Sequence, residues 1–228
     1  MGDNDIIPGV VFQAGPLTVT ATVITTWVLI AGIALFFWLT TRALAARPGA
    51  LQTLLEGVVS AIDDAVAAVA PAHAKQLMPF IGSLWIFLVI ANLSGLIPGV
   101  KAPTGDLSAT AALAILVFLS VHWFGIRAQG LRNYLRHYLT PSPVLLPFHL
   151  ISEVTRTIAL AVRLFGNIIS LEMTALLILL VAGFLAPVPI LMLHIVEALV
   201  QAYIFGMLAL IYVAGGLQSQ QLRQQQQE

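Results

Sequence analysis

The chain has 228 residues and a formal net charge of zero; 59% of its residues are hydrophobic and only 9% are charged. Soluble domains contain roughly 45–50% apolar and about 25% charged residues. A soluble core of this size does not need so many apolar side chains, so the composition predicts an integral membrane protein. The neutral balance gives no reason to expect a nucleic-acid partner. The absence of cysteine excludes disulfides and thiolate metal sites.

Three hydrophobic stretches in the first part of the chain are long enough to cross a bilayer. A hydrocarbon core about 30 Å thick needs roughly 20 apolar residues in a helix. The three stretches lie at about 19–41, 77–97 and 107–125. Basic residues or a proline-glycine pair follow each of them. We expect all three to be transmembrane helices.

The segment 51–69 differs from these stretches because it is amphipathic. Glu56, Asp63 and Asp64 interrupt its apolar residues. A helix with one apolar and one charged face favours the boundary between lipid and water. We therefore expect this segment to lie on the membrane surface.

Two longer hydrophobic segments follow, at about 148–185 and 190–217, with a proline-rich turn between them. About 38 helical residues extend roughly 57 Å, nearly twice the bilayer core. The first of these segments must either break, with Gly166 and Gly183 as candidates, or incline strongly. Because no proline interrupts it, we predict a strongly inclined helix. The chain is then a single all-α membrane domain, in which the last two helices form a long inclined hairpin.

The basic residues predict the orientation of the chain. They are concentrated in the loops after the first and third spans and in the tail, whereas the opposite side carries only Lys101. The positive-inside rule then places the N-terminus outside and the C-terminus in the cytoplasm. The tail 218–228 is mostly glutamine, and we expect it to be polar, cytoplasmic and disordered.

A polar stripe runs along the segment 148–185. On an ideal helix, Glu172 falls about 180° from Arg163. The side chains close to the direction of Arg163 are those of His149, Ser152, Arg156, Asn167, Ser170 and Thr174. An arginine at the centre of a membrane costs about 2.5–3.5 kcal/mol, and such residues usually serve a function. The alternative is that Arg163 reaches an interface or pairs with a structural carboxylate. For Arg156, nearer the cytoplasmic end, the interfacial alternative carries equal weight.

The last segment carries a second polar face with His194, Glu197 and Gln201, close to Tyr212. Intramembrane Glu and His residues commonly form ion relays. The structural alternative is that Glu172 forms a buried pair with either His194 or Glu197.

Two further interpretations concern single polar residues. Asn167 could hold two helices together through a hydrogen bond. His73, His122 and His137 fall near expected helix ends or in loops, and the sequence assigns them no role.

These residues resemble a known family. The run Arg163-Leu-Phe-Gly-Asn167, followed by Glu172, is similar to the signature helix of subunit a of F-type ATP synthases. The stretch from Asn92 to Pro98 and the segment from His194 through Gln201 to Phe205 also resemble that family. The resemblance covers roughly residues 15 to 215.

The resemblance implies a stator subunit that is not an enzyme by itself and holds no cofactor or metal. Its partners would be a ring of c subunits, the b subunits of the peripheral stalk and the rest of the synthase, in the lipid of a bacterial inner membrane. It implies that Arg163 faces the ring carboxylates and separates two aqueous half-channels. The positions that it places at or near the ion path are Asn167, Glu172, His194 and Gln201. Glu197 shares the face of His194, and we add it to that path.

The chain departs from the family at one position. Many members have glutamate fourteen residues before the arginine, where this chain has His149. Glu153, one turn later, is a candidate substitute on the cytoplasmic access path, with Arg156 nearby. The sequence leaves the coupling ion open between protons and sodium.

Two other classes of protein remain as alternatives. A secondary transporter or an unrelated channel subunit could use Arg163 as a counter-charge for its substrate, but no inverted repeat is visible. A structural membrane scaffold would have no need for Arg163, Glu172 and Gln201 in the middle of the membrane.

Overall fold

The computed structural model describes residues 10–14, 17–42, 49–97, 100, 102–131, 146–182 and 188–224. Its long helices are α1 (Ala21–Arg42), α2 (Ala50–Val69), α3 (Ala74–Leu93), α4 (Leu107–Gln129), α6 (Leu146–Ala182) and α7 (Val188–Gln224). Two short 3-10 helices, η1 (Ser94–Leu96) and η2 (Pro103–Gly105), lie between α3 and α4. Five helices, all except α2, are long and apolar enough to cross a membrane. The predicted class of all-α membrane protein is confirmed.

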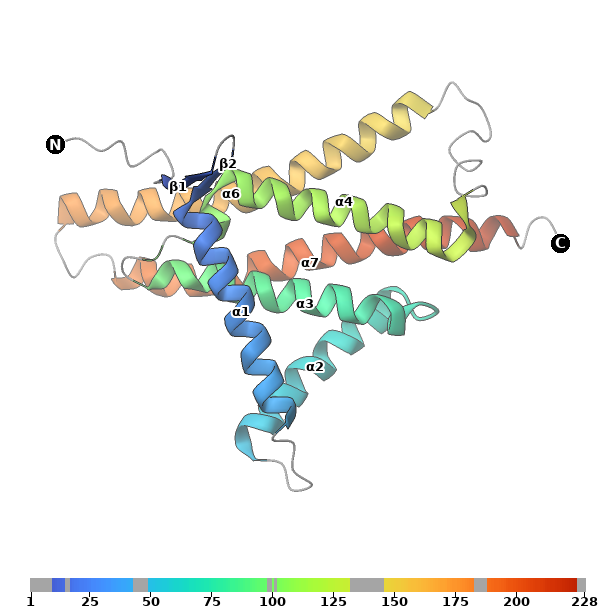
Figure 1. Ribbon diagram of the computed structural model, residues 1–228, viewed down its shortest axis with the longest axis horizontal. Helices are drawn as coiled ribbons and strands as arrows, with labels where there is room; N and C mark the ends of the chain where they lie inside the picture. Colours follow the sequence, from blue (N-terminus) through green and yellow to red (C-terminus); the bar gives the residue numbers. More distant parts are fainter. Residues whose placement is uncertain are drawn as a thin grey trace.

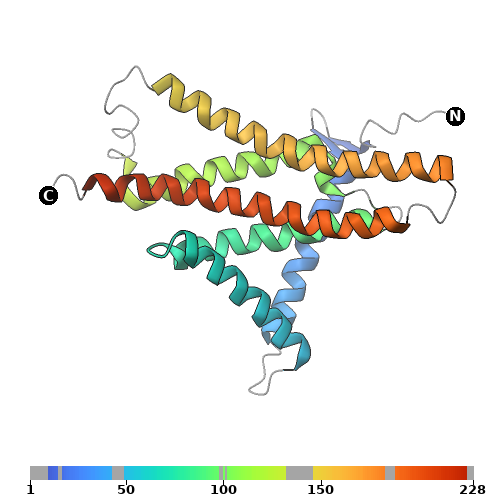
Figure 2. The same ribbon diagram turned by 180° about the vertical axis from the view of Figure 1, so that it is seen from behind.

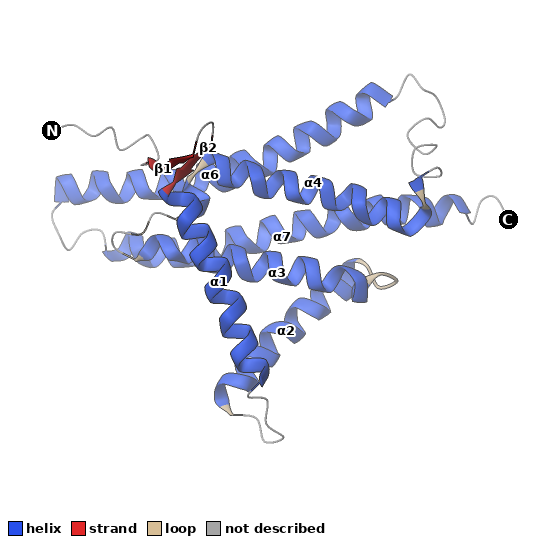
Figure 3. Cartoon of the chain, in the orientation of Figure 1, coloured by secondary structure: helices blue, strands red, loops and turns tan. Residues whose placement is uncertain are grey.

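A small β-hairpin precedes the helices. Strands β1 (Val10–Ala14) and β2 (Leu17–Thr20) pair antiparallel. They are the only strands in the described part of the chain (Figure 3). The sequence does not predict this hairpin, because the strands are too short to give a clear period-2 pattern.

The helices form a layered bundle that α1 crosses. Helices α3, α4, α6 and α7 run roughly side by side, whereas α1 runs across their shared direction (Figure 1). Seen from behind, α6 and α7 lie on the face turned toward the viewer (Figure 2). The two helices that carry the predicted polar residues are therefore neighbours on one outer face of the bundle.

In the α6–α7 hairpin, α6 has about the predicted length, whereas α7 is longer than the predicted segment 190–217. Each helix has 37 residues, which corresponds to about 55 Å and exceeds the bilayer core of about 30 Å. Helix α6 continues without a break through Gly166, although its axis bends so that its first part diverges from α7 (Figures 1 and 2). Gly183 and Pro187 lie outside the described residues. The strong inclination to the bilayer stays a prediction.

Local signals explain where α4 begins and ends. The Asp106 carboxylate accepts a hydrogen bond from the Ser108 backbone N–H at 2.9 Å, which is an N-cap contact. Helix α4 then continues to Gln129, past the predicted end at residue 125. It stops at Gly130, whose φ of 80° suits glycine and disfavours other residues.

The end of α7 corrects one expectation. The tail from Gln218 was expected to be disordered, but α7 continues to Gln224. Glutamine is a good helix former, so a run of glutamines extends a helix that already exists. At the other end, α7 begins at Val188, which places Pro189 in the first turn, where proline is tolerated.

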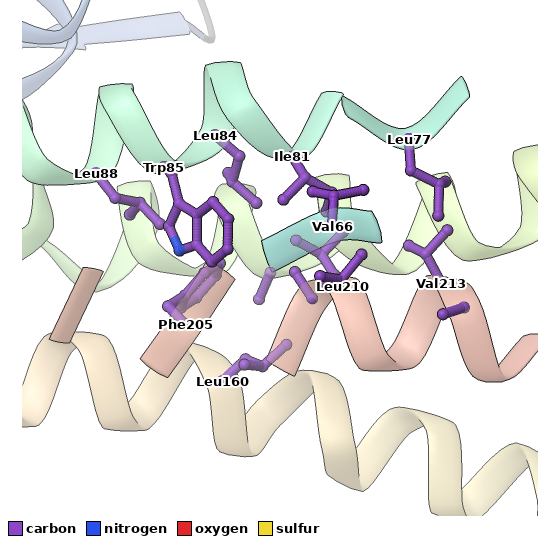
Figure 4. Packing of buried hydrophobic residues seen from close by; sticks show 14 of the residues in the cluster. Val66, Leu77, Ile81, Leu84, Trp85, Leu88, Leu160, Phe205, Leu210 and Val213 are labelled. Atoms are coloured by element: carbon purple, nitrogen blue, oxygen red, sulfur yellow. The ribbon is translucent and has the colours of Figure 1, made fainter. Parts of the chain in front are cut away.

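The bundle core lies between α3, α7 and the inner sides of α2, α4 and α6. A row of side chains on α3 with helical spacing faces a row on α7 (Figure 4). The buried residues that Figure 4 labels are Val66, Leu77, Ile81, Leu84, Trp85, Leu88, Leu160, Phe205, Leu210 and Val213. Lipid tails are as apolar as these side chains, so close packing rather than escape from water holds such helices together.

Trp85 of α3 packs closely against the backbone of α7. Its indole Nε1–H donates to the Tyr203 carbonyl oxygen at 3.3 Å, and its ring stacks on that of Tyr203 with centroids 6.0 Å apart. A Cβ atom placed on Gly206 would overlap the Trp85 ring. The glycine therefore lets the indole approach the α7 backbone.

Helix α2 is amphipathic, as the sequence predicts. Val66 is fully buried, and Ile62 and Val69 pack against the core. Leu51 and Leu54 at its other end are 58% and 65% exposed. An uncovered apolar surface of this kind is suited to contact with lipid.

Candidate functional site

A hydrogen bond between side chains joins α6 to α7 at the middle of the predicted site. Asn167 Nδ2 donates to Gln201 Oε1 at 2.6 Å. Asn167 is half-buried, and Gln201 is only 2% exposed. The structure thus brings together two residues that the sequence analysis selected on separate helices. It also confirms that Asn167 links two helices.

Arg163 lies one turn before Asn167 but points away from the bundle. Its side chain is exposed, as are those of Ser170 and Thr174 further along the same stripe. Leu164 and Ile168 are buried on the inner side of α6. Within the described part of the chain, Arg163 forms no hydrogen bond or ion pair. The guanidinium is therefore available to a partner outside this chain.

Polar side chains are buried where the end of α3 meets the first half of α7. Asn92 Nδ2 donates to the Ala198 carbonyl oxygen at 3.1 Å. His194 packs beside Gly95, whose Cβ, if present, would lie 3.8 Å from His194 Nε2. These two polar residues and Gln201 are buried between α3, η1 and α7.

Several buried atoms in this region have unused hydrogen-bonding capacity. The atoms without a hydrogen-bond partner in the described part of the chain include Asn92 Oδ1, Thr104 Oγ1, His194 Nε2 and Gln201 Nε2. Buried polar atoms normally have partners, and a water or a transported ion can serve as one. The region is therefore chemically suited to a hydrated path through an otherwise apolar bundle.

Thr104 was not predicted as a site residue, and Asn92 was noted only as part of a motif. An asparagine at the end of an apolar span was the available signal for Asn92. Nothing in the sequence alone distinguishes Thr104 from an ordinary loop residue.

Glu172 and Glu197 are the two acidic residues of the predicted outer path. Glu172 belongs to α6, but its side chain lies outside the described residues. Its approach to His194 therefore stays a prediction. Glu197 is half-buried on α7, three residues after His194.

A second polar cluster lies between α4, α6 and α7. His122 Nε2 of α4 is 3.5 Å from Glu153 Oε2 of α6. The Arg156 guanidinium lies over the Tyr212 ring, 4.5 Å from its centroid. These four side chains line one small cavity of about 30 Å³. His149, one turn before Glu153, is exposed on α6.

His122 has no predicted role in the sequence. It sits near the end of a hydrophobic span, where histidine is unremarkable. Only the packing of α4 against α6 brings it to Glu153, and no sequence spacing within one helix could show that contact.

Spanning helices that carry an exposed arginine on one face and buried polar groups within define an integral membrane protein with a polar functional site. The sequence pattern of the family described as ATP synthase A chain matches residues 23–214. The chain therefore belongs to that family, the non-catalytic subunit a in the membrane sector of F-type ATP synthases.

Individual relatives agree with this family. An ATP synthase subunit a 2 of Pelobacter propionicus is 63% identical over 217 residues, covering 95% of both chains. An ATP synthase subunit a of Legionella pneumophila is 54% identical over 226 residues, covering 99% of this chain and 98% of the relative. An ATP synthase subunit a 1 of Hahella chejuensis is 63% identical over 204 residues, covering 90% of this chain and 87% of the relative. The resemblance seen in the sequence is confirmed.

Proposed function

We propose that this chain is the stator that guides ions through two half-channels and couples their passage to the rotation of a ring of c subunits. The observation that carries the proposal is the exposed Arg163 on the outer face of α6. An arginine in an apolar helix, with no counter-charge among the described side chains of its own chain, requires one from a neighbour. A ring that presents carboxylates at the same depth supplies it.

The chemistry of the guanidinium suits this role. It stays protonated under all conditions that proteins experience. Its fixed positive charge favours the ionised form of a carboxylate that passes it. It also repels a cation that would otherwise cross directly between the half-channels. One elementary charge crossing 100 mV provides about 2.3 kcal/mol, which drives rotation only if that direct leak is closed.

The outer half-channel follows the buried polar groups of α3 and α7. Asn92 and His194 lie at the end that the positive-inside rule places outside, and Gln201 joins them to Asn167. Ions entering there would meet Asn167 one turn from Arg163. We place Glu172 and Glu197 on the same path as an acid-imidazole relay with His194.

The inner half-channel leads from the ring to the cytoplasm beside the first part of α6. His149, Glu153 and Arg156 lie there, before Arg163 along the helix. Because one path opens on each side of Arg163, an ion can pass from one path to the other only while it is bound to the rotating ring.

The arrangement of helix ends supports the proposed orientation. In Figure 1 the first residues of α6 and the last residues of α4 and α7 lie toward one end of the bundle, and the opposite ends of these helices lie toward the other. The charge pattern assigns the first group to the cytoplasm and the N-terminus to the outside of a bacterial inner membrane. Helix α1 buries only Thr22, so its apolar sides remain available to lipid or to the b subunits.

Purification and reconstitution test the proposal. The chain carrying an affinity tag should co-purify with c subunits, b subunits and the catalytic head. The reconstituted complex should acidify vesicles when ATP is added. Isolation of the chain without c subunits under conditions that preserve other membrane complexes would contradict the proposal.

A further inference from the structure

The cluster between α4 and α6 contains an imidazole, that of His122, which has no place in the two half-channels proposed above. We propose that His122 and Glu153 form a proton-exchange pair that connects the ring to the cytoplasm, an inference that rests on the function proposed above. The two side chains are 27% and 22% exposed, so the pair is neither sealed in the core nor free in solvent.

The contacts of the imidazole define how it carries a proton. His122 Nδ1 is 2.9 Å from the Phe118 carbonyl oxygen. A carbonyl only accepts, so Nδ1 bears the hydrogen. In the neutral ring the lone pair is then on Nε2, the atom that faces the Glu153 carboxyl group at 3.5 Å. A proton placed on either atom would bridge the lone pair and the carboxylate, so the geometry suits a pair that shares one exchangeable proton.

The surroundings allow this proton to move. The cavity of about 30 Å³ at the pair is large enough for one water molecule. Its ionisable lining consists of His122 from α4, Glu153 and Arg156 from α6, and Tyr212 from α7. The guanidinium of Arg156 is held over the Tyr212 ring, and both side chains line the same cavity as the pair.

The position of the pair fits the inner path rather than the ring interface. Glu153 lies ten residues before Arg163, about 15 Å along the helix axis. It points about 80° away from the direction of Arg163, toward α4.

The transfer can be written with every proton accounted for. A proton released from a ring carboxylate binds to Glu153 and gives a neutral carboxylic acid. The acid transfers the proton to His122 Nε2, which leaves a carboxylate and an imidazolium. The imidazolium releases a proton to cytoplasmic water, and both groups return to their starting state. During ATP hydrolysis the same steps run in reverse.

The experiment compares His122→Gln and Glu153→Gln in the complete complex. Proton uptake driven by ATP and passive conduction after removal of the head are measured, each normalised to the assembled complex. We expect proton conduction to fall by about tenfold in each variant. This is less than the rate contribution of a general acid in catalysis, because water still reaches the path. The double variant should be no slower than the single ones, since both residues serve one step. The matched control is His73→Gln, in the turn between α2 and α3, which should conduct as the natural chain does.

A variant in which His122 and Glu153 are exchanged tests whether the pair transfers protons or has a purely structural role. His122→Glu combined with Glu153→His keeps one imidazole and one carboxyl group in contact and should restore at least half of the conduction. The dependence of conduction on cytoplasmic pH should flatten in the single variants and return in the exchanged one. Glu153→Asp serves if the glutamine variants fail to assemble, and it should keep the pH dependence.

Arg163→Ala distinguishes failure of the pair from failure of the proposed function. If it abolishes pumping while both glutamine variants conduct normally, the pair is overturned and the stator function stands. If Arg163→Ala also pumps normally, the stator function itself fails. Loss of conduction that the exchanged variant does not restore, or conduction that requires sodium, would also overturn the proton-exchange pair.

Discussion

Asn167 on α6 donates a hydrogen bond to Gln201 on α7, with 2.6 Å between Nδ2 and Oε1. This contact joins the outer face that carries Arg163 to the buried polar groups around His194. The two helices therefore hold the proposed ring-facing surface and the proposed outer path in a defined relation to each other.

Replacement of either partner should weaken both the hairpin and ion transfer. Asn167→Leu and Gln201→Leu should each lower the thermal stability of the complex. The coupling energy from the double variant should be about 0.6 kcal/mol and no more than about 1.7 kcal/mol, the average and the maximum for hydrogen bonds between membrane helices. Thr174→Val on the exposed side of α6 is the control and should leave stability unchanged. Strictly additive effects would show that the bond contributes nothing.

Arg163→Ala should abolish ATP-driven pumping while the complex still assembles, because it removes the charge proposed to block the leak. Arg156→Ala should be milder, since Arg156 contacts Tyr212 and lies two turns nearer the proposed cytoplasmic end. Vesicle acidification and subunit content of the purified complex measure both effects. Coupled pumping at the natural rate in Arg163→Ala would refute the role of the arginine.

Gly206→Ala should destabilise the contact between α3 and α7. The added Cβ would overlap the Trp85 ring, and overpacking of this kind costs about 1–3 kcal/mol. Gly215→Ala on the same helix is the matched control, because no atom lies within 4 Å of its added Cβ. Thermal unfolding of the purified complex compares the two variants. Equal stability of the two variants would mean that Trp85 moves aside without weakening the contact between α3 and α7.

The absence of cysteine from the chain makes labelling direct. His149→Cys and Glu153→Cys should react with a membrane-impermeant thiol reagent from the cytoplasmic side only. His194→Cys should react, if more slowly because of its burial, from the outer side only. Labelling is followed in vesicles of known orientation. The opposite pattern would reverse the assignment of the two paths.

Much of the fold follows from length and composition. A run of apolar residues long enough to cross a bilayer has few alternatives to a helix, because backbone groups in lipid must pair within their own segment. The predicted segment 148–185 accordingly corresponds to α6, Leu146–Ala182. Its polar stripe was also predictable, because the angle between residues of one helix follows from their spacing.

Contacts between helices were less accessible to sequence reasoning. His122 and Glu153 meet because α4 and α6 pack together, and their separation of 31 positions carries no geometric information by itself. Asn167 and Gln201 could each be selected, but their hydrogen bond depends on the depth and rotation of two helices. The end of α7 was misplaced because a polar composition suggests disorder even where an existing helix continues through Gln224.

The outward position of Arg163 also bears on the biogenesis of this chain. A newly inserted copy exposes the guanidinium to lipid at a cost of about 2.5–3.5 kcal/mol, and no group in the described part of the chain offsets it. That cost disappears when an acidic neighbour arrives beside the helix. The residue proposed to close the leak in the working complex therefore also makes the solitary subunit less stable than the assembled one, so the same charge favours recruitment of the correct partner.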